Sequence, residues 1–257
     1  MGPPAAPTLR EWLRERPFTL VLSSGFFGFF AHTGMLEALV EEGLRPRRVV
    51  GSSAGALVGG AYAAGIDPAA LADELLRVKR ADFWDPGLGL GLLRGQRFRA
   101  QLERIIGDIR IEDGRVPTSL VVHDVLAHAP RALSTGALAP IIQASCAVPG
   151  LFQPVWIDGR PYLDGGILDR PGTSPLVDGE RTLYHHLASR SPWRALGSPG
   201  MQIPARNGLT ALVLESLPRS GPFKLEVGAQ AYERARAATR TALRARLAGP
   251  ILRIGAT

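Results

Sequence analysis

The stretch RRVVGSSAGALVGGAYAAG, residues 47–65, decides the fold expected for this chain. It begins with a short β-branched run, which is typical of a strand, and continues with small apolar residues that fit a closely packed helix. Between the two lies GSSAG, residues 51–55, which matches the pattern G-x-S-x-G. Five matching positions are a weak signal by themselves. A strand before the pattern and a helix after it predict that Ser53 is a nucleophile on a sharp turn.

The residues around Ser53 suit that turn. Gly51 and Gly55 stand two positions before and two positions after it, where a missing side chain lets neighbouring backbone approach closely. Ser53 would then lie at the N-terminus of the helix, where free N–H groups and the helix dipole stabilise developing negative charge. The alternative is a serine that only caps a packed helix. The strand–turn–helix context favours the nucleophile.

Strands and helices alternate along the rest of the chain. Strands are predicted at residues 18–24, 47–53, 118–125, 154–166 (a hairpin that turns at 158–159), 182–188 and 209–216. Helices are predicted at residues 28–42, 54–65, 67–80, 96–106, 138–148 and 224–247, with a loop at 83–95. This alternation predicts an α/β fold, a three-layer sandwich with a largely parallel central sheet and helices on both faces. We expect one domain over residues 1–257 with its core at 18–215.

The composition is that of an ordinary globular protein, with 46% apolar and 21% charged residues. The single cysteine, Cys146, excludes a disulfide within the chain and fits a reducing compartment. No secretory signal and no membrane-spanning run is visible, so we expect a cytoplasmic protein. Because no His, Cys or Asp residues cluster at metal-ligand spacing, neither a metal nor a cofactor is expected.

A nucleophilic serine needs a base, and the five histidines carry no local motif that marks one. Asp164 is better situated, because it follows a predicted strand and precedes two glycines in an exposed turn. An aspartate can take the serine proton directly if burial raises its pKa. By the same reasoning Asp124, Asp158 and Asp169 are rivals, and an ordinary Asp-Gly turn is the alternative for Asp164 itself.

The third part of such a site is an oxyanion hole, which needs backbone N–H groups aimed at the substrate carbonyl oxygen. The turn SGFFG, residues 24–28, follows the first predicted strand and precedes a helix. It is therefore the candidate for these donors, through Gly25, Phe26, Phe27 and Gly28.

The order of these features resembles the patatin-like phospholipases. A glycine-containing turn after the first strand, the motif A-H-x-G at residues 31–34, the G-x-S-x-G pattern and a D-G-G turn at 164–166 follow one another as in that family. IIQASCAVPGLFQPVWIDGRPYLDGG, residues 141–166, is similar as well. The resemblance covers residues 18–170, about two thirds of the chain.

The resemblance implies a Ser–Asp dyad without a catalytic histidine, carried here by Ser53 and Asp164, with Gly165 and Gly166 completing the motif. It implies hydrolysis of lipid acyl esters, of the phospholipase A, lysophospholipase or esterase type, through an acyl-serine intermediate. It also implies an α/β sandwich that differs from the α/β-hydrolase fold. The chain departs from the family at the oxyanion turn, because many members read G-G-G-x-[RK]-G and this turn lacks the basic residue.

Four of the nine phenylalanines are crowded into that turn and the residues just after it: Phe26, Phe27, Phe29 and Phe30. We expect them to line an acyl pocket beside Ser53, because lipid pockets are mostly apolar and aromatic. The alternative is that some of them pack beneath the following helix.

The net charge of +7 is concentrated at the C-terminus, where residues 224–257 hold seven Lys or Arg and two Glu. Arg236, Arg240 and Arg244 recur every four residues and form one stripe on the predicted helix. The stripe is a candidate for peripheral contact with an anionic membrane, and a solvated helix face is the alternative. Nucleic-acid binding is not expected, because no recognised motif is present.

Two other functions fit part of the pattern. An α/β-hydrolase esterase would use Ser53, Asp164 and either His185 or His186 as a triad in that order. That fold usually has several strands before its nucleophile, whereas one predicted strand precedes the nucleophile strand here. A catalytically weak lipid-binding scaffold is the second alternative, and the presence of both Ser53 and Asp164 argues against it.

Overall fold

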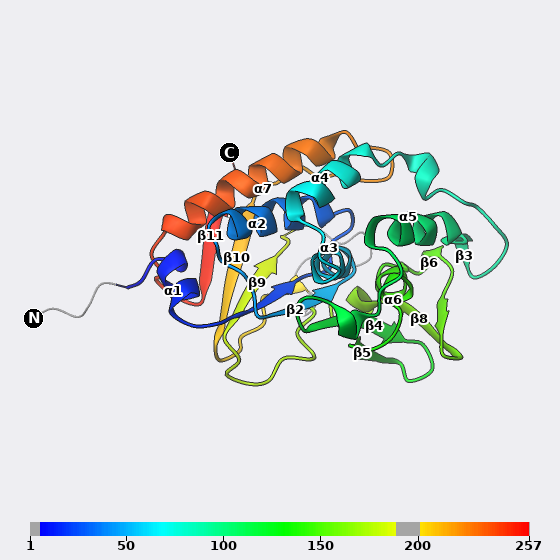
Figure 1. The fold of residues 1–257 in the computed structure, drawn as a ribbon, viewed down its shortest axis with the longest axis horizontal. Helices are drawn as coiled ribbons and strands as arrows, with labels where there is room; N and C mark the ends of the chain where they lie inside the picture. The colour runs from blue at the N-terminus through cyan, green and yellow to red at the C-terminus, as the bar shows by residue number, and fades with distance from the viewer. Residues whose placement is uncertain (1–5, 189–200, 257) are drawn as a thin grey trace, which may run out of the picture.

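The structure, a computed structural model, describes residues 6–188 and 201–256. Its helices are α1 (Leu9–Glu15), α2 (Phe29–Glu41), α3 (Ala54–Ala63), α4 (Pro68–Arg77), α5 (Gln96–Ile106), α6 (Leu138–Ser145) and α7 (Val227–Arg244). Its strands are β1 (Thr19–Leu22), β2 (Arg48–Ser52), β3 (Gly91–Leu93), β4 (Thr118–Asp124), β5 (Ala129–Leu133), β6 (Gly150–Phe152), β7 (Val155–Ile157), β8 (Arg160–Asp164), β9 (Thr182–His186), β10 (Leu209–Glu215) and β11 (Ile251–Gly255). Figure 1 shows these elements around one central sheet.

The central sheet has the strand order β11-β10-β9-β1-β2-β4-β8-β7, and β5 also pairs with β4. Neighbouring strands from β11 to β4 are parallel, whereas β5, β7 and β8 are joined by antiparallel pairs. The predicted α/β class with a largely parallel sheet is therefore confirmed. The nucleophile strand β2 lies in the middle of the sheet, between β1 and β4.

The two faces of the sheet are covered differently. Leu20, Leu22, Val49, Leu120 and Leu183 face the large core cluster, which also holds the buried residues of α2, α3, α6 and α7. On the opposite face, a smaller cluster joins Val21, Val50, Val121, Tyr184 and Ala211 to Leu176, Leu209 and Ile203. Sequence analysis predicted helices on both faces; in the described part of the chain, connecting segments cover this second face.

The α2–α7 contact explains the basic stripe of the C-terminal helix. A Cβ on Gly34 would lie 2.2 Å from the carbonyl oxygen of Tyr232, so the two helices approach closely only because glycine stands there. Arg236 then pairs with Glu37 at 3.2 Å, and Arg240 pairs with Glu41 at 2.7 Å. Two of the three stripe arginines therefore form ion pairs that join α7 to α2.

Most predicted elements agree with the structure to within a few residues. Helix α4 begins where Asp67 caps it by accepting from Ala69 N, with Pro68 as its first residue. Helix α6 ends at Ser145, three residues before the predicted end. The predicted loop 83–95 contains β3, which pairs with β6. Sequence analysis also missed α1, β5, β6 and β11, all of which have seven residues or fewer.

Candidate active site

Ser53 lies on the sharp turn between β2 and α3. Its backbone has φ 53° and ψ −116°, a conformation that residues other than glycine rarely adopt. A Cβ on Gly51 would lie 2.4 Å from the carbonyl oxygen of Gly55, and a Cβ on Gly55 would lie 2.0 Å from that of Leu22. The two glycines therefore allow the tight approach that holds Ser53 in a strained backbone, and such strain is typical of functional sites.

Asp164 accepts a hydrogen bond from the Ser53 hydroxyl, with 2.6 Å between Ser53 Oγ and Asp164 Oδ2. The two residues are 111 positions apart, and both are buried. Asp164 ends β8, which pairs antiparallel with β4, and β4 in turn pairs with β2. Its second oxygen, Oδ1, accepts from Gly166 N at 2.7 Å. The carboxylate is thus held by backbone on one side and faces the serine on the other.

The three rival aspartates are engaged elsewhere. Asp124 pairs with Arg160 at 2.8 Å and also accepts from backbone N–H groups of its own turn. Asp169 accepts from the N–H groups of Gly172, Thr173 and Ser174. Asp158 lies in the turn between β7 and β8 with φ 48°. None of the three contacts Ser53 through a hydrogen bond of the described residues.

The histidines of the triad alternative pair with other groups. His185 Nδ1 lies 2.8 Å from Nδ1 of His32, and His186 Nδ1 lies 2.9 Å from the hydroxyl of Tyr184. Burial lowers the pKa of His32 to about 4 and the pKa of His186 to about 4, and it lowers the pKa of His185 well below its ordinary value. In the described residues, neither His185 nor His186 makes a hydrogen bond to Ser53 or Asp164.

The turn at residues 24–28 borders the same space as Ser53. Phe27 has φ 54°, which bends the chain sharply, and the Gly28 N–H donates to the carbonyl oxygen of Gly25 at 2.8 Å. Sequence analysis gave the N–H of Gly28 as one of the oxyanion donors. The structure does not agree, because this N–H closes the turn and is not available to an oxyanion. The N–H groups of Gly25, Phe26 and Phe27 have no hydrogen-bond partner among the described residues.

Helix α3 and helix α6 supply further polar groups at the turn. Ser53 N donates to the hydroxyl of Ser145 at 2.9 Å, and that hydroxyl donates to the carbonyl oxygen of Val121 at 2.6 Å. The thiol of Cys146 donates to the carbonyl oxygen of Ser53 at 3.2 Å. Burial and the nearby charge of Asp164 raise the pKa of that thiol well above its ordinary value, so it stays protonated. Sequence analysis gave neither residue a role, although both lie in the A-S-x-A run it quoted.

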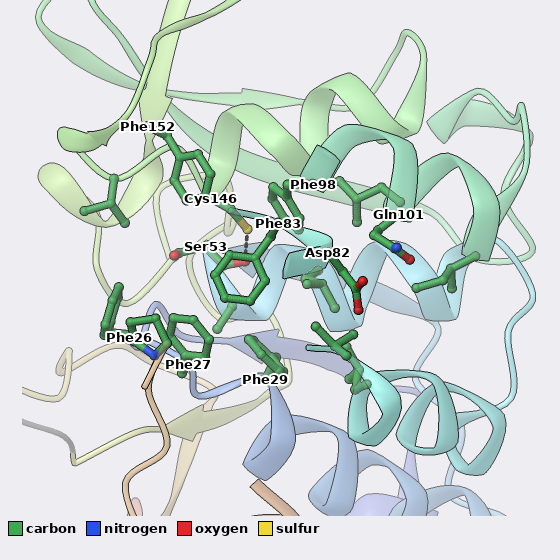
Figure 2. Close-up of a pocket in the computed structure, with 18 of the residues that line it drawn as sticks. Phe26, Phe27, Phe29, Ser53, Asp82, Phe83, Phe98, Gln101, Cys146 and Phe152 are labelled. Atoms are coloured by element: carbon green, nitrogen blue, oxygen red, sulfur yellow. Dashed lines mark hydrogen bonds between the residues drawn. The ribbon is translucent and has the colours of Figure 1, made fainter. Parts of the chain in front are cut away.

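A cavity of about 1080 Å³, its open mouth included, extends from Ser53 between the helices. Its lining is almost entirely apolar. Ala54, Leu57 and Ala61 give one face of α3 to the wall, because their spacing places them on the same side of the helix. Figure 2 shows Phe83 and Phe98 in this lining together with Ser53. A space of this kind fits a flexible hydrocarbon chain.

Three of the four clustered phenylalanines line this cavity, as Figure 2 shows for Phe26, Phe27 and Phe29. Phe30 does not line it. Its side chain is buried, and its ring occupies the space that a Cβ on Gly228 would need, at 2.5 Å. Phe30 therefore packs between α2 and α7, which corrects the sequence expectation for that residue. The reason is helical geometry, because Phe29 and Phe30 are neighbours on α2 and point in different directions.

Residues 6–188 and 201–256 contain no group of three or more His, Cys, Asp or Glu side chains arranged to hold a metal ion. Within the same ranges, no helix is both long and apolar enough to cross a membrane.

Comparisons with known proteins give a consistent result. Residues 20–177 match the family model described as patatin-like phospholipase. An uncharacterized NTE family protein of Mycobacterium tuberculosis is 36% identical over 180 residues, which cover 69% of this chain and 50% of that protein. The neuropathy target esterase sws of Drosophila persimilis is 28% identical over 174 residues, which cover 64% of this chain and 12% of that protein. The chain thus spans half the length, or less, of these curated relatives.

A solved structure is similar as well. The crystal structure of VipD from Legionella pneumophila matches with a TM-score of 0.56 and 18% sequence identity, over 82% of this chain and 52% of that chain. At this low identity, the similarity concerns the fold alone.

Proposed function

This chain belongs to the patatin-like phospholipase family, and from this premise we propose that it hydrolyses carboxylic esters of lipids through an acyl-serine intermediate. In the proposal, Ser53 is the nucleophile and Asp164 is its general base. The observation that carries it is the 2.6 Å hydrogen bond from Ser53 Oγ to Asp164 Oδ2 at the edge of an apolar cavity. The esterase among the named relatives supports the same reaction class.

The geometry suits a two-step acyl transfer. In the first step Ser53 Oγ attacks the ester carbonyl carbon while its proton passes to Asp164. The tetrahedral intermediate then collapses, the bond to the alcohol oxygen breaks, and Asp164 returns the proton to the leaving alcohol. In the second step water attacks the carbonyl carbon of the acyl-serine while its proton passes to Asp164. The bond from that carbon to Ser53 Oγ then breaks, Asp164 returns the proton to Ser53 Oγ, and the carboxylic acid leaves.

The charge that develops on the carbonyl oxygen needs donors. We propose that they come from the Gly25–Phe27 turn and from the start of α3, because both border the cavity beside Ser53. The Ser53 N–H is excluded, since it donates to Ser145. The Ala54 N–H is the next free donor of α3 within the described residues, and the helix dipole favours an anion there.

The acyl chain of the substrate is proposed to occupy the apolar cavity. Burial of hydrocarbon contributes about 0.8 kcal/mol per methylene group, which makes long-chain esters favourable ligands for such a space. In the described residues no histidine reaches the serine, so a Ser–Asp–His triad has no observation in its favour.

The experiment combines a soluble ester with a covalent probe. Wild type should hydrolyse a short-chain p-nitrophenyl ester, and a fluorophosphonate should label one serine, identified as Ser53 by mass spectrometry. Asp164→Asn should lower kcat by a factor of about 10² to 10⁴, the usual contribution of a general base. Asp158→Asn is the matched control, because Asp158 is a turn carboxylate of the same hairpin and should keep full activity.

Two results would contradict the proposal. One is labelling of a serine other than Ser53 in the folded wild type. The other is an Asp164→Asn variant that remains as active as Asp158→Asn, with both shown to be folded by circular dichroism.

A further inference from the structure

A projecting segment beside the cavity exposes three leucines. Residues 86–93, here called the finger, end with β3 and lie at the right-hand edge of Figure 1. Leu88 is 100% exposed, Leu90 is 83% exposed and Leu92 is 50% exposed, whereas the next residue, Leu93, is completely buried. Apolar side chains gathered in this way on a surface indicate a binding site for an apolar partner.

The finger is held in shape by its backbone, so the exposure of its leucines is a property of the fold. Gly87 N donates to Leu92 O at 3.0 Å and Arg94 N donates to Asp85 O at 3.0 Å, which closes its base. Asp85 also accepts from Gly95 N and Arg97 N. At the tip, the side chain of Gln153 donates to Leu88 O at 2.8 Å.

The finger is continuous with the proposed acyl cavity. Leu93 at its end lines that cavity, and so do Trp84 before it and Phe152 of β6, which pairs with Leu93 in the small parallel sheet. Phe223, which is 67% exposed, contacts Trp84 edge to face, with 5.9 Å between ring centroids. Exposed apolar groups thus continue outward from the cavity wall.

The same segment of the chain is rich in positive charge. Residues 77–99 hold six Lys or Arg and two Asp. Both aspartates accept hydrogen bonds from backbone N–H groups of the same segment. Lys79, Arg80 and Arg94 have no carboxylate partner in the described residues, unlike Arg236 and Arg240 of α7. The guanidinium of Arg80 lies over the rings of Trp84 and Phe223, at 5.7 Å and 5.1 Å from their centroids.

We propose that the finger and the unpaired cations beside it dock this protein on the surface of an anionic lipid bilayer. Leucines that enter the acyl region, with Arg and Lys at the level of the headgroups, match the two chemical layers of such a surface. Docking in this position would bring the mouth of the cavity to the lipid, so this part of the inference rests on the proposed function. The membrane contact then lies at the finger rather than on α7.

The test separates docking from hydrolysis by the choice of lipid. Vesicles are made from ether-linked phosphatidylcholine, alone or in equal parts with ether-linked phosphatidylglycerol, because these lipids carry no ester to cleave. Wild type should sediment with the anionic vesicles and more weakly with the neutral ones. Hydrolysis of a soluble p-nitrophenyl ester is measured on the same preparations.

Two variants and one control distinguish the leucines from the cations. L88S/L90S should weaken binding to anionic vesicles about tenfold or more, since the bilayer then no longer buries the two most exposed leucine side chains of the finger. K79Q/R80Q should weaken it roughly tenfold, as expected from the loss of two charges near the surface. V177S/I251S changes two exposed apolar residues outside the finger and the cavity lining and should bind like wild type. All variants should keep hydrolysis of the soluble ester.

The proposal is overturned if wild type hydrolyses the soluble ester but does not bind the anionic vesicles. It is overturned equally if L88S/L90S binds as tightly as V177S/I251S. A wild type that forms a dimer, with a monomeric L88S/L90S and no vesicle binding, would instead assign the finger to a contact between two copies of the chain. Vesicle binding without ester hydrolysis would uphold the docking surface and contradict the proposed function.

Discussion

The hydroxyl of Ser145 joins the turn at Ser53 to the centre of the sheet. It accepts from Ser53 N at 2.9 Å and donates to the carbonyl oxygen of Val121, in β4, at 2.6 Å. Ser145 is fully buried at the end of α6. One side chain therefore fixes the backbone of the candidate nucleophile relative to the strand that pairs with β8, on which Asp164 lies.

Ser145→Ala should consequently impair both the reaction and the fold. Loss of the hydroxyl leaves a buried N–H and a buried carbonyl without this partner, so we expect a loss of about 1–3 kcal/mol of stability. We also expect kcat for a soluble ester to fall about tenfold or more with little change in KM, because small displacements of reacting groups have large effects on rate. Thr239→Ala is the control. It removes a comparable buried hydroxyl that donates within α7, and it should lower stability without lowering kcat.

Gly55→Ala should destabilise the protein strongly. The new Cβ would lie 2.0 Å from the carbonyl oxygen of Leu22, and neither of these backbone segments can move without disturbing β1 or the Ser53 turn. Overpacking of this kind is expected to lower the free energy of unfolding by about 1–3 kcal/mol or more. Urea denaturation measures it. Gly221→Ala has open space around the added Cβ and should leave stability nearly unchanged; equal stability of the two variants would contradict the close approach.

Ala61→Leu should shift substrate preference toward short acyl chains. Ala61 lies on the cavity face of α3, two turns from Ser53 and thus about 12 Å along the helix axis. A larger side chain there shortens the space for a long chain but leaves the mouth open. We expect the ratio of kcat/KM for long-chain over short-chain p-nitrophenyl esters to fall about tenfold or more. The short-chain ester serves as the internal control, and an unchanged ratio in a folded variant would sink the prediction.

Phe27→Ala tests the aromatic wall at the other end of the cavity. Phe27 contacts Phe26, Phe29 and Phe83 with ring centroids 4.9–5.9 Å apart, so its removal widens the space next to Ser53. Chain-length preference measured on the same ester series should therefore change. Phe30→Leu is the comparison, because Phe30 packs against α7 outside the cavity. The chain-length preference of this variant should match that of wild type.

The buried histidines predict a loss of stability in acid. Burial lowers the pKa of His186 to about 4 from the ordinary 6.5. As the pH falls below 6.5, the unfolded chain binds a proton before the folded one does. The stability that neutral His186 contributes is therefore complete above pH 6.5 and is lost as the pH falls toward 4. At pH 5 the loss is about 2 kcal/mol. The buried pair His32 and His185 acts in the same direction.

His186→Gln checks this prediction. Glutamine does not titrate, and its amide oxygen can accept a hydrogen bond from Tyr184, which now pairs with His186. The free energy of unfolding, measured by urea denaturation at pH 7 and at pH 5, should fall less in this variant than in wild type. An equal fall in the free energy of unfolding between pH 7 and pH 5 in both proteins would show that His186 does not contribute to the loss of stability in acid. The variant also bears on the triad alternative, because it should keep hydrolysing the soluble ester.

Sequence analysis captured the features that depend on neighbouring residues. The strand, turn and helix around Ser53 were predicted to within two residues, since a G-x-S-x-G turn and small helix residues act locally. The start of α4 was predicted to within one residue for the same reason. Three of the four clustered phenylalanines line the cavity as expected, but Phe30 could not be separated from them, because a run of aromatic letters does not give side-chain direction.

The parallel α/β framework and the turn that carries Ser53 could be predicted from the residues, because both follow from local backbone preferences and from the spacing of apolar residues. Which aspartate meets that serine depends on the tertiary fold. The residues alone left Asp164 beside Asp124, Asp158 and Asp169, and the antiparallel pairing of β8 with β4 brings Asp164 to 2.6 Å from Ser53 Oγ. Likewise, the packing of α7 on α2 occupies two arginines of the basic stripe, whereas the finger keeps its leucines exposed. Such contacts join residues far apart in the chain, and their distances depend on strand register and helix packing, which no short stretch of sequence encodes.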